Sequence, residues 1–119
     1  MKLLRSLTVA AILISPPAYA GEAAIIAAKA TRTGDTWRFD VTLEHADTGW
    51  GHYADGWEVL APDGTQLGYR ELLHPHVTEQ PFTRSLSGVD IPAEVTTVTI
   101  RAHDSVHDWN EETFTLTLP

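Results

Sequence analysis

The chain lacks cysteine and is almost without methionine, which excludes several kinds of chemistry. Among its 119 residues there is no cysteine, and Met1 is the only methionine. No disulfide can stabilise the fold, no thiol can act as a nucleophile, and a lipid anchor on a cysteine is not expected. The thiolate and thioether ligands that suit copper(I) are missing as well.

Long hydrophobic runs are also missing, because the longest apolar stretch covers only residues 7–14. A membrane-spanning helix needs roughly 20 such residues. This stretch follows Lys2 and Arg5 and precedes Ala18-Tyr19-Ala20, which is a small-x-small cleavage pattern. Residues 1–20 are therefore predicted to be a removable secretion signal, and residues 21–119 a single domain. This predicts a periplasmic or secreted protein with no membrane insertion after cleavage.

Basic residues are scarce compared with acidic ones. The chain holds 8 Lys and Arg against 16 Asp and Glu, which gives a formal net charge of −8. Such a domain repels phosphate backbones and anionic membrane surfaces, so nucleic acid is not expected as a partner. Cations and basic proteins remain compatible with this charge, and so does a role in solubility alone.

Alternating hydrophobicity dominates what is present. Between residues 37 and 43, Trp37, Phe39, Val41 and Leu43 alternate with polar side chains. A period of two predicts a strand with one face in the core and one in water. The alanine-rich segment 23–33 is also compatible with a helix, but the tight turn signal at residues 33–35 favours a strand there.

Short segments of this kind recur between turn signals along the whole domain. Turns every eight to twelve residues are typical of an all-β fold, and they predict an antiparallel β-sandwich of about seven strands. The layout resembles an immunoglobulin-like or fibronectin type III-like sandwich without its disulfide, with Trp57 in place of that fold's buried tryptophan. The predicted strands are 23–33, 36–46, 52–61, 65–73, 82–87, 95–103 and 111–118.

Histidines provide the main candidates for chemistry. Neutral imidazole is the commonest metal ligand and suits zinc, copper(II) and nickel. In His74-Pro75-His76 the two side chains are expected on the same side of an extended segment that Pro75 makes rigid. This pair is the predicted centre of a metal site. The six histidines are His45, His52, His74, His76, His103 and His107.

Topology suggests which residues complete that centre. In an antiparallel sandwich the loops after the second, fourth and sixth predicted strands lie at the same end. His52, His103 or His107 would then join the central pair, and the ion would be copper(II) or zinc. The predicted role is carriage, buffering or delivery to a periplasmic protein partner. The alternative is that these histidines are ordinary loop residues that hydrogen-bond backbone carbonyls.

A second class of function is also open. Trp50, Tyr53 and Trp109 could form a metal-free surface that binds a protein or a glycan, or they could cap the core. Arg84 is predicted to pair with Glu79, Glu71 or Glu58, with an anionic ligand as the alternative.

Catalysis is not expected, because the serines lie in no nucleophile-elbow pattern and a small sandwich has little room for an enclosed pocket. The stretch from Trp50 to Ser85, and above all LHPH at residues 73–76 with EQPFTRS at residues 79–85, resembles a group of small exported bacterial proteins without an assigned activity. This resemblance implies export and brings no function.

Overall fold

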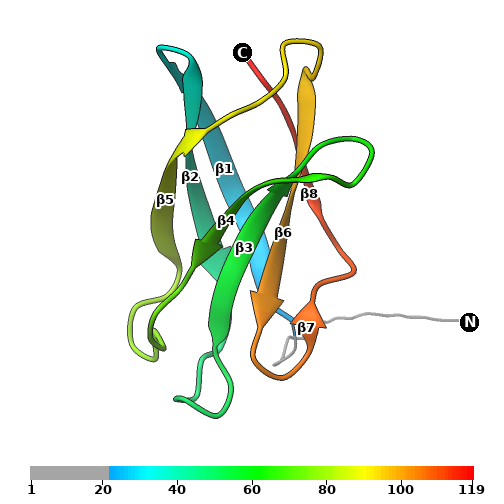
Figure 1. Cartoon of the computed structure of the whole chain (residues 1–119). Coiled ribbons are helices and arrows are strands. Elements are labelled where there is room, and N and C mark those ends of the chain that lie inside the picture. The colour runs from blue at the N-terminus through cyan, green and yellow to red at the C-terminus, as the bar shows by residue number, and fades with distance from the viewer. Residues whose placement is uncertain (1–21) are drawn as a thin grey trace, which may run out of the picture.

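The computed structural model describes residues 22–119, so the predicted secretion signal at residues 1–20 lies outside the described part. This part contains eight strands (Figure 1). No helix within residues 22–119 has the length and apolar character needed to cross a membrane. The strands are β1 (Ala24–Thr33), β2 (Thr36–Glu44), β3 (Ala54–Leu60), β4 (Gln66–Glu71), β5 (Phe82–Val89), β6 (Thr97–Asp104), β7 (Asp108–Trp109) and β8 (Phe114–Thr117).

The strands form two antiparallel sheets, as the alternating pattern predicts. One sheet has the order β1-β2-β5, and the other has the order β4-β3-β6-β7. β8 also pairs with β6, so β7 and β8 share one edge of that strand. The fold is thus the predicted all-β sandwich.

The core lies between the two sheets and is built from the inward rows of their strands. Trp37, Phe39, Val41 and Leu43 of β2 are all buried, as the alternation predicts. From the opposite sheet, Trp57 of β3 is fully buried. Large apolar side chains removed from water in this way stabilise a fold by about 1.5–3 kcal/mol each. β6, in the same sheet as β3, contributes three buried apolar residues: Val98, Ile100 and Ala102.

The structure differs from the prediction near the C-terminus. The sequence predicts a loop at residues 104–110, between the strands expected at 95–103 and 111–118. In the structure, Asp108 and Trp109 form β7 and pair with the end of β6. Asp108 has a φ of 65°, a left-handed conformation that turns the chain back tightly towards β6. The last strand is consequently shorter than the predicted 111–118, and the count is eight rather than seven.

The loops after β2, β4 and β6 meet at one end of the sandwich, as predicted (Figure 1). The carboxylate of Asp47, after β2, accepts a hydrogen bond of 2.7 Å from the backbone N–H of His76, after β4. His52 Nε2 lies 3.2 Å from Oδ1 of Asp104, the last residue of β6. We call this end, made of residues 45–53, 72–81 and 104–107, the loop pole.

Candidate metal centre

The inward rows of two strands continue past the apolar core into polar residues at the loop pole. In β2 the buried row at residues 37, 39, 41 and 43 is followed at the same spacing by His45 and Asp47. In β6 the buried row at residues 98, 100 and 102 ends on Asp104. These side chains are therefore ligand-type groups placed between the sheets, with exposed fractions of 3%, 5% and 0% in the order named.

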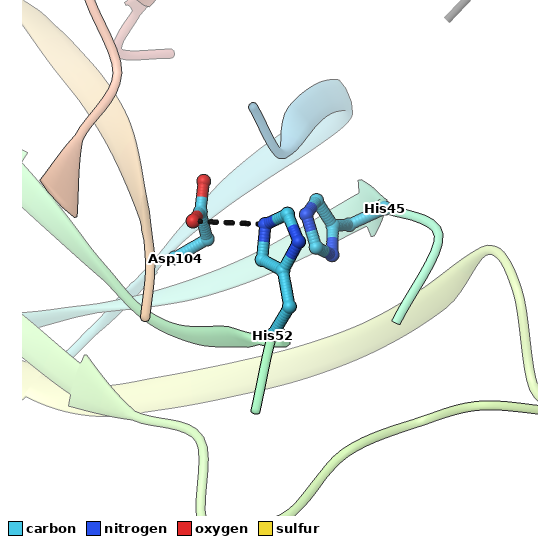
Figure 2. A group of neighbouring side chains, drawn as sticks. All are labelled: His45, His52 and Asp104. Carbon is cyan, nitrogen blue, oxygen red and sulfur yellow. Dashed lines mark ion pairs between the residues drawn. The ribbon is translucent and has the colours of Figure 1, made fainter. Parts of the chain in front are cut away.

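Two imidazoles and one carboxylate converge at this point. His45, His52 and Asp104 each offer a ligand atom, and these three atoms all lie within 4.8 Å of one another (Figure 2). Within residues 22–119, no other three His, Cys, Asp or Glu residues meet this condition.

The contact between His52 and Asp104 is close, but it is not a hydrogen bond. His52 Nε2 is buried and lies 3.2 Å from Asp104 Oδ1, yet it has no hydrogen-bond partner among the described residues. Two ligands of a tetrahedral zinc ion, each about 2.05 Å from the metal, are roughly 3.3 Å apart. Both atoms can therefore face one ion placed between them.

A carboxylate orients His45. Its Nδ1 lies 2.5 Å from Asp47 Oδ1, and an ionised carboxylate can only accept, so the ring donates. In the neutral ring the lone pair is then at Nε2. Asp47 is itself held by the backbone N–H groups of Ala54, at 3.0 Å, and His76, at 2.7 Å. A carboxylate behind an imidazole in this way fixes the tautomer of metal-ligating histidines.

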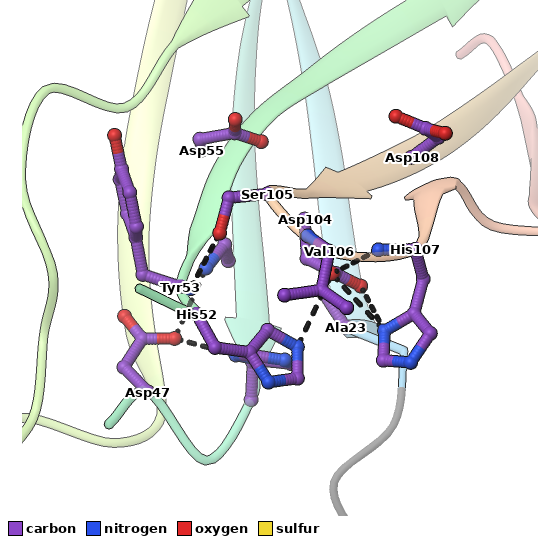
Figure 3. A network of polar contacts seen from close by, with 12 residues as sticks. Ala23, Asp47, His52, Tyr53, Asp55, Asp104, Ser105, Val106, His107 and Asp108 are labelled. Carbon is purple, nitrogen blue, oxygen red and sulfur yellow. Dashed lines mark hydrogen bonds and ion pairs between the residues drawn. The ribbon is translucent and has the colours of Figure 1, made fainter. Parts of the chain in front are cut away.

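Asp104 is a buried carboxylate whose side-chain neighbours among residues 22–119 are histidines. It accepts hydrogen bonds from the backbone N–H groups of Val106, at 2.9 Å, and His107, at 2.7 Å (Figure 3). Burial raises the pKa of the Asp104 carboxyl, but these backbone bonds and the His107 ring outweigh it and keep that pKa below its usual value. Among the contacts of residues 22–119, no Lys or Arg pairs with this carboxylate. A cation between the rings would compensate the buried charge.

His107, one of the predicted ligands, lies beside this group. Its Nδ1 is 3.1 Å from Asp104 Oδ1, and its ring centroid is 5.0 Å from that of His52. With its side chain 39% exposed, it occupies the rim of the loop pole. His107 thus contacts Asp104 through both its backbone N–H and its ring.

The predicted centre, His74 and His76, is placed differently. The two rings do lie on one side, with centroids 4.6 Å apart, but they belong to no three-ligand group in the described chain. Nη2 of Arg84 lies 2.9 Å from His76 Nε2, and because a guanidinium only donates, the Nε2 lone pair is occupied. His76 also stacks on Phe82, with centroids 3.9 Å apart. In this arrangement the Nε2 lone pair of His76 is engaged by Arg84.

The stretch that carries the resemblance to small exported proteins holds the second loop in place. Arg84 pairs with Glu79 at 3.3 Å, which confirms one of the predicted pairings. The side chain of Gln80 donates to the carbonyl of His76 and accepts from the backbone N–H of His45, both at 3.0 Å. Through Gln80 this segment is therefore hydrogen-bonded to the backbone of His45.

His103 faces away from the central group. It neighbours Asp104 in β6, and successive side chains of a strand point to opposite faces. Its Nδ1 lies 2.5 Å from Asp55 Oδ1. The prediction that His103 could complete the same site is not supported by this placement.

The predicted aromatic surface divides into two parts. Trp50 is 68% exposed and meets Tyr53 edge to face, with centroids 5.5 Å apart. Trp109 instead packs against His103, at 4.8 Å between centroids, and under the guanidinium of Arg101. Only Trp50 and Tyr53 therefore form the predicted contact.

Two members of this group, His45 and Asp104, are not among the predicted ligands. A signal for both is present in the sequence, because each continues the two-residue alternation of a core row by one step beyond its last apolar residue.

Burial, followed by the charge of Arg84, lowers the pKa of His76 below its usual value of about 6.5. As the pH falls, His76 therefore takes up a proton in the unfolded chain before it does so in the folded chain. The contribution of neutral His76 to the unfolding free energy is intact above pH ~6.5 and is lost below it, by at most about 1.4 kcal/mol per pH unit. We expect His76→Gln to flatten the fall in unfolding free energy between about pH 7 and 5 in urea titrations. His74→Gln removes an imidazole from the same loop as a control. Equal flattening in both variants would contradict this assignment.

Comparison with known proteins adds one relative. Over 76 residues the chain is 46% identical to a protein of Halomicrobium mukohataei described as "Putative lipoprotein". The aligned stretch covers 64% of this chain and 37% of that relative, so the chain spans little more than a third of the relative's length. No family model matches the chain, and no solved structure matches it.

Proposed function

We propose that this protein binds one divalent transition metal ion, zinc or copper(II), through His45, His52 and Asp104, and that it carries or buffers this ion. The observation that supports the proposal is the approach of the three ligand atoms to within 4.8 Å of one another. Two imidazoles and a carboxylate form a donor set that suits both metals.

The spacing already matches in part. Two ligands of a tetrahedral ion, each about 2.05 Å from the metal, are roughly 3.3 Å apart. His52 Nε2 and Asp104 Oδ1 lie 3.2 Å apart, and the other two distances within the group must close from at most 4.8 Å. Asp47 behind His45 supplies the outer hydrogen bond that such a site needs.

Three protein ligands leave a fourth position of a tetrahedral ion open. Water, His107 or a donor from another protein can take that position. A shell with an open fourth position favours exchange over permanent structural binding, and this agrees better with carriage or buffering than with a closed structural site.

Export is part of the proposal. The predicted secretion signal at residues 1–20 and a relative described as a lipoprotein both support work outside the cytoplasm. A periplasmic or secreted domain meets zinc and copper(II) without competing thiols of its own, since the chain has no cysteine.

Calorimetric titration of the chelator-treated exported chain tests the proposal. We expect one zinc or copper(II) ion to bind in the micromolar range or tighter, and His52→Ala to weaken binding by about 100-fold or more, because it removes one of three ligands. His74→Ala is the matched control, since it removes another imidazole from the same loop pole. Absence of binding to the unaltered chain would contradict the proposal. Loss of binding in His74→Ala alone would return the centre to the pair at residues 74 and 76.

A second function is favoured by one specific observation. Large apolar side chains are exposed on all three loops of the loop pole, which supports a metal-free surface that binds a protein or a glycan. A chain that binds no ion but loses a glycan or protein ligand on Trp50→Ala would favour this function. These side chains are Trp50, Leu73, Val77 and Val106, with exposed fractions of 68%, 69%, 55% and 53%.

A further inference from the structure

We propose that the end of β6 carries a second, solvent-exposed site for a divalent transition metal ion, formed by His103 and Asp108. It shares no ligand with the group of His45, His52 and Asp104. It therefore stands or falls independently of the proposed function above.

The spacing between the two side chains is that of ligands around an ion. His103 Nε2 lies 3.6 Å from Asp108 Oδ1. This is longer than an N–H···O hydrogen bond, which ends near ~3.2 Å. It is close to the roughly 3.3 Å between two ligands of one tetrahedral ion. An ion between these atoms would need only a small closure.

A third residue sets the ring of His103 for this role. Asp55 Oδ1 lies 2.5 Å from His103 Nδ1, and the carboxylate can only accept, so Nδ1 carries the proton. In the neutral ring the lone pair then lies at Nε2, on the side of Asp108. The edge-to-face contact with Trp109, 4.8 Å between centroids, restrains the ring plane. The arrangement is again a carboxylate behind a histidine that faces an open position.

Irregular backbone brings both carboxylates to the ring. Ala54 pairs with Asp104 and Gly56 with His103, so Asp55 is an extra residue in a bulge of β3. Bulges re-aim a side chain in this way, here towards β6. On the other side, Asp108 begins β7 with a φ of 65° and pairs opposite Asp104.

The two sites lie on opposite faces of the same strand end. His103 and Asp104 are consecutive in β6, and Figure 3 shows Asp55 and Asp108 away from the group of His52, Asp104 and His107. The side chain of Asp108 is 85% exposed, whereas that of Asp104 is 0% exposed. With two protein ligands and water in the remaining positions, the exposed site should bind more weakly and exchange faster than the buried one.

Copper(II) titration of the exported chain, followed by calorimetry and by electron paramagnetic resonance, tests this inference. We expect two binding events, the second at least tenfold weaker than the first. Asp108→Asn should weaken the second event at least tenfold and leave the first unchanged. Asparagine tolerates the left-handed backbone and keeps the side-chain shape, so the fold is retained. Asp90→Asn, at an exposed position outside both sites, is the control for net charge.

Two further variants separate the sites. His103→Ala should abolish the second event and its nitrogen hyperfine signal, while His52→Ala should affect the first event only. Unchanged second binding in both Asp108→Asn and His103→Ala would overturn the inference, as would a single event in the unaltered chain that survives His103→Ala. Either result would leave His103 as a structural ion pair with its two aspartates. Loss of the first event alone would leave the exposed site standing.

Discussion

Asp104→Ala is expected to lower the unfolding free energy of the metal-free protein by about 3–5 kcal/mol. The carboxylate is fully buried, and the backbone N–H groups of Val106 and His107 both donate to its Oδ1. Leaving a donor without an acceptor away from water costs roughly 1–3 kcal/mol, and the substitution removes the acceptor of two partly buried N–H groups. Urea denaturation with a chelator present measures the loss.

Asp104→Asn is the informative companion. Its amide oxygen can still accept from both N–H groups, so the stability loss should be only about 1–2 kcal/mol. The negative charge is gone, however, and zinc or copper(II) affinity should fall by about 100-fold or more. Equal destabilisation by the two variants would contradict the hydrogen-bonding role of Oδ1. Undiminished metal affinity in Asp104→Asn would contradict its role as a ligand.

Acid should reduce the difference in unfolding free energy between the unaltered protein and Asp104→Asn. Because the folded pKa of Asp104 is below its usual value, its contribution to stability is present above about pH 3.9 and is lost as the pH falls through the folded value. The stability gap between the unaltered protein and Asp104→Asn should therefore narrow in strongly acidic solution.

Trp57→Ala is expected to cost about 3–5 kcal/mol, because a large side chain leaves a cavity between the sheets. Trp57 is 0% exposed and has the largest volume among the fully buried side chains of the described chain. A domain of this size is stable by about 5–15 kcal/mol in total, so the loss is a large share. The change in urea midpoint measures it, with Trp50→Ala at an exposed loop position expected to stay within about 0.5 kcal/mol.

Trp57→Phe refines this prediction. The indole Nε1 of Trp57 is buried without a hydrogen-bond partner among the described residues. Phenylalanine keeps most of the apolar volume and removes that unsatisfied donor, so it should cost clearly less than alanine. A phenylalanine variant as unstable as the alanine variant would show that the indole makes a polar contact of its own.

Metal should stabilise only those variants that retain the site. An ion that binds only the folded chain adds about 2.7 kcal/mol at a concentration of 100 times Kd. Trp57→Phe should gain this increment with zinc, while Asp104→Asn should not.

Much of the fold could be predicted because a strand's side-chain parity is a local property. The alternation between Trp37 and Leu43 is enough to predict which face of β2 is buried. All four apolar residues of this row are buried in the structure. The antiparallel order of short strands is likewise enough to bring the loops after β2, β4 and β6 to one end, where Asp47 reaches the His76 backbone. β7 could not be predicted, because a strand of two residues is too short to show alternation and its first residue, Asp108, has a left-handed backbone conformation.

Which histidines gather around Asp104 is not a local property of the sequence. The alternation of side chains along a strand cannot show that Arg84 occupies the lone pair of His76. That contact depends on how the loop after β4 folds back on β5. The alternation also cannot show that Asp47 holds His45.

The amino-acid sequence by itself determined an acidic, thiol-free β-sandwich, with a predicted export signal and its histidine-bearing loops at one end. Only the tertiary structure decided which imidazoles meet a carboxylate there and which are engaged elsewhere. The reason is physical: sheet faces follow from alternation between neighbours in the chain, whereas ligand distances depend on bulges, loop conformation and contacts between segments far apart in sequence.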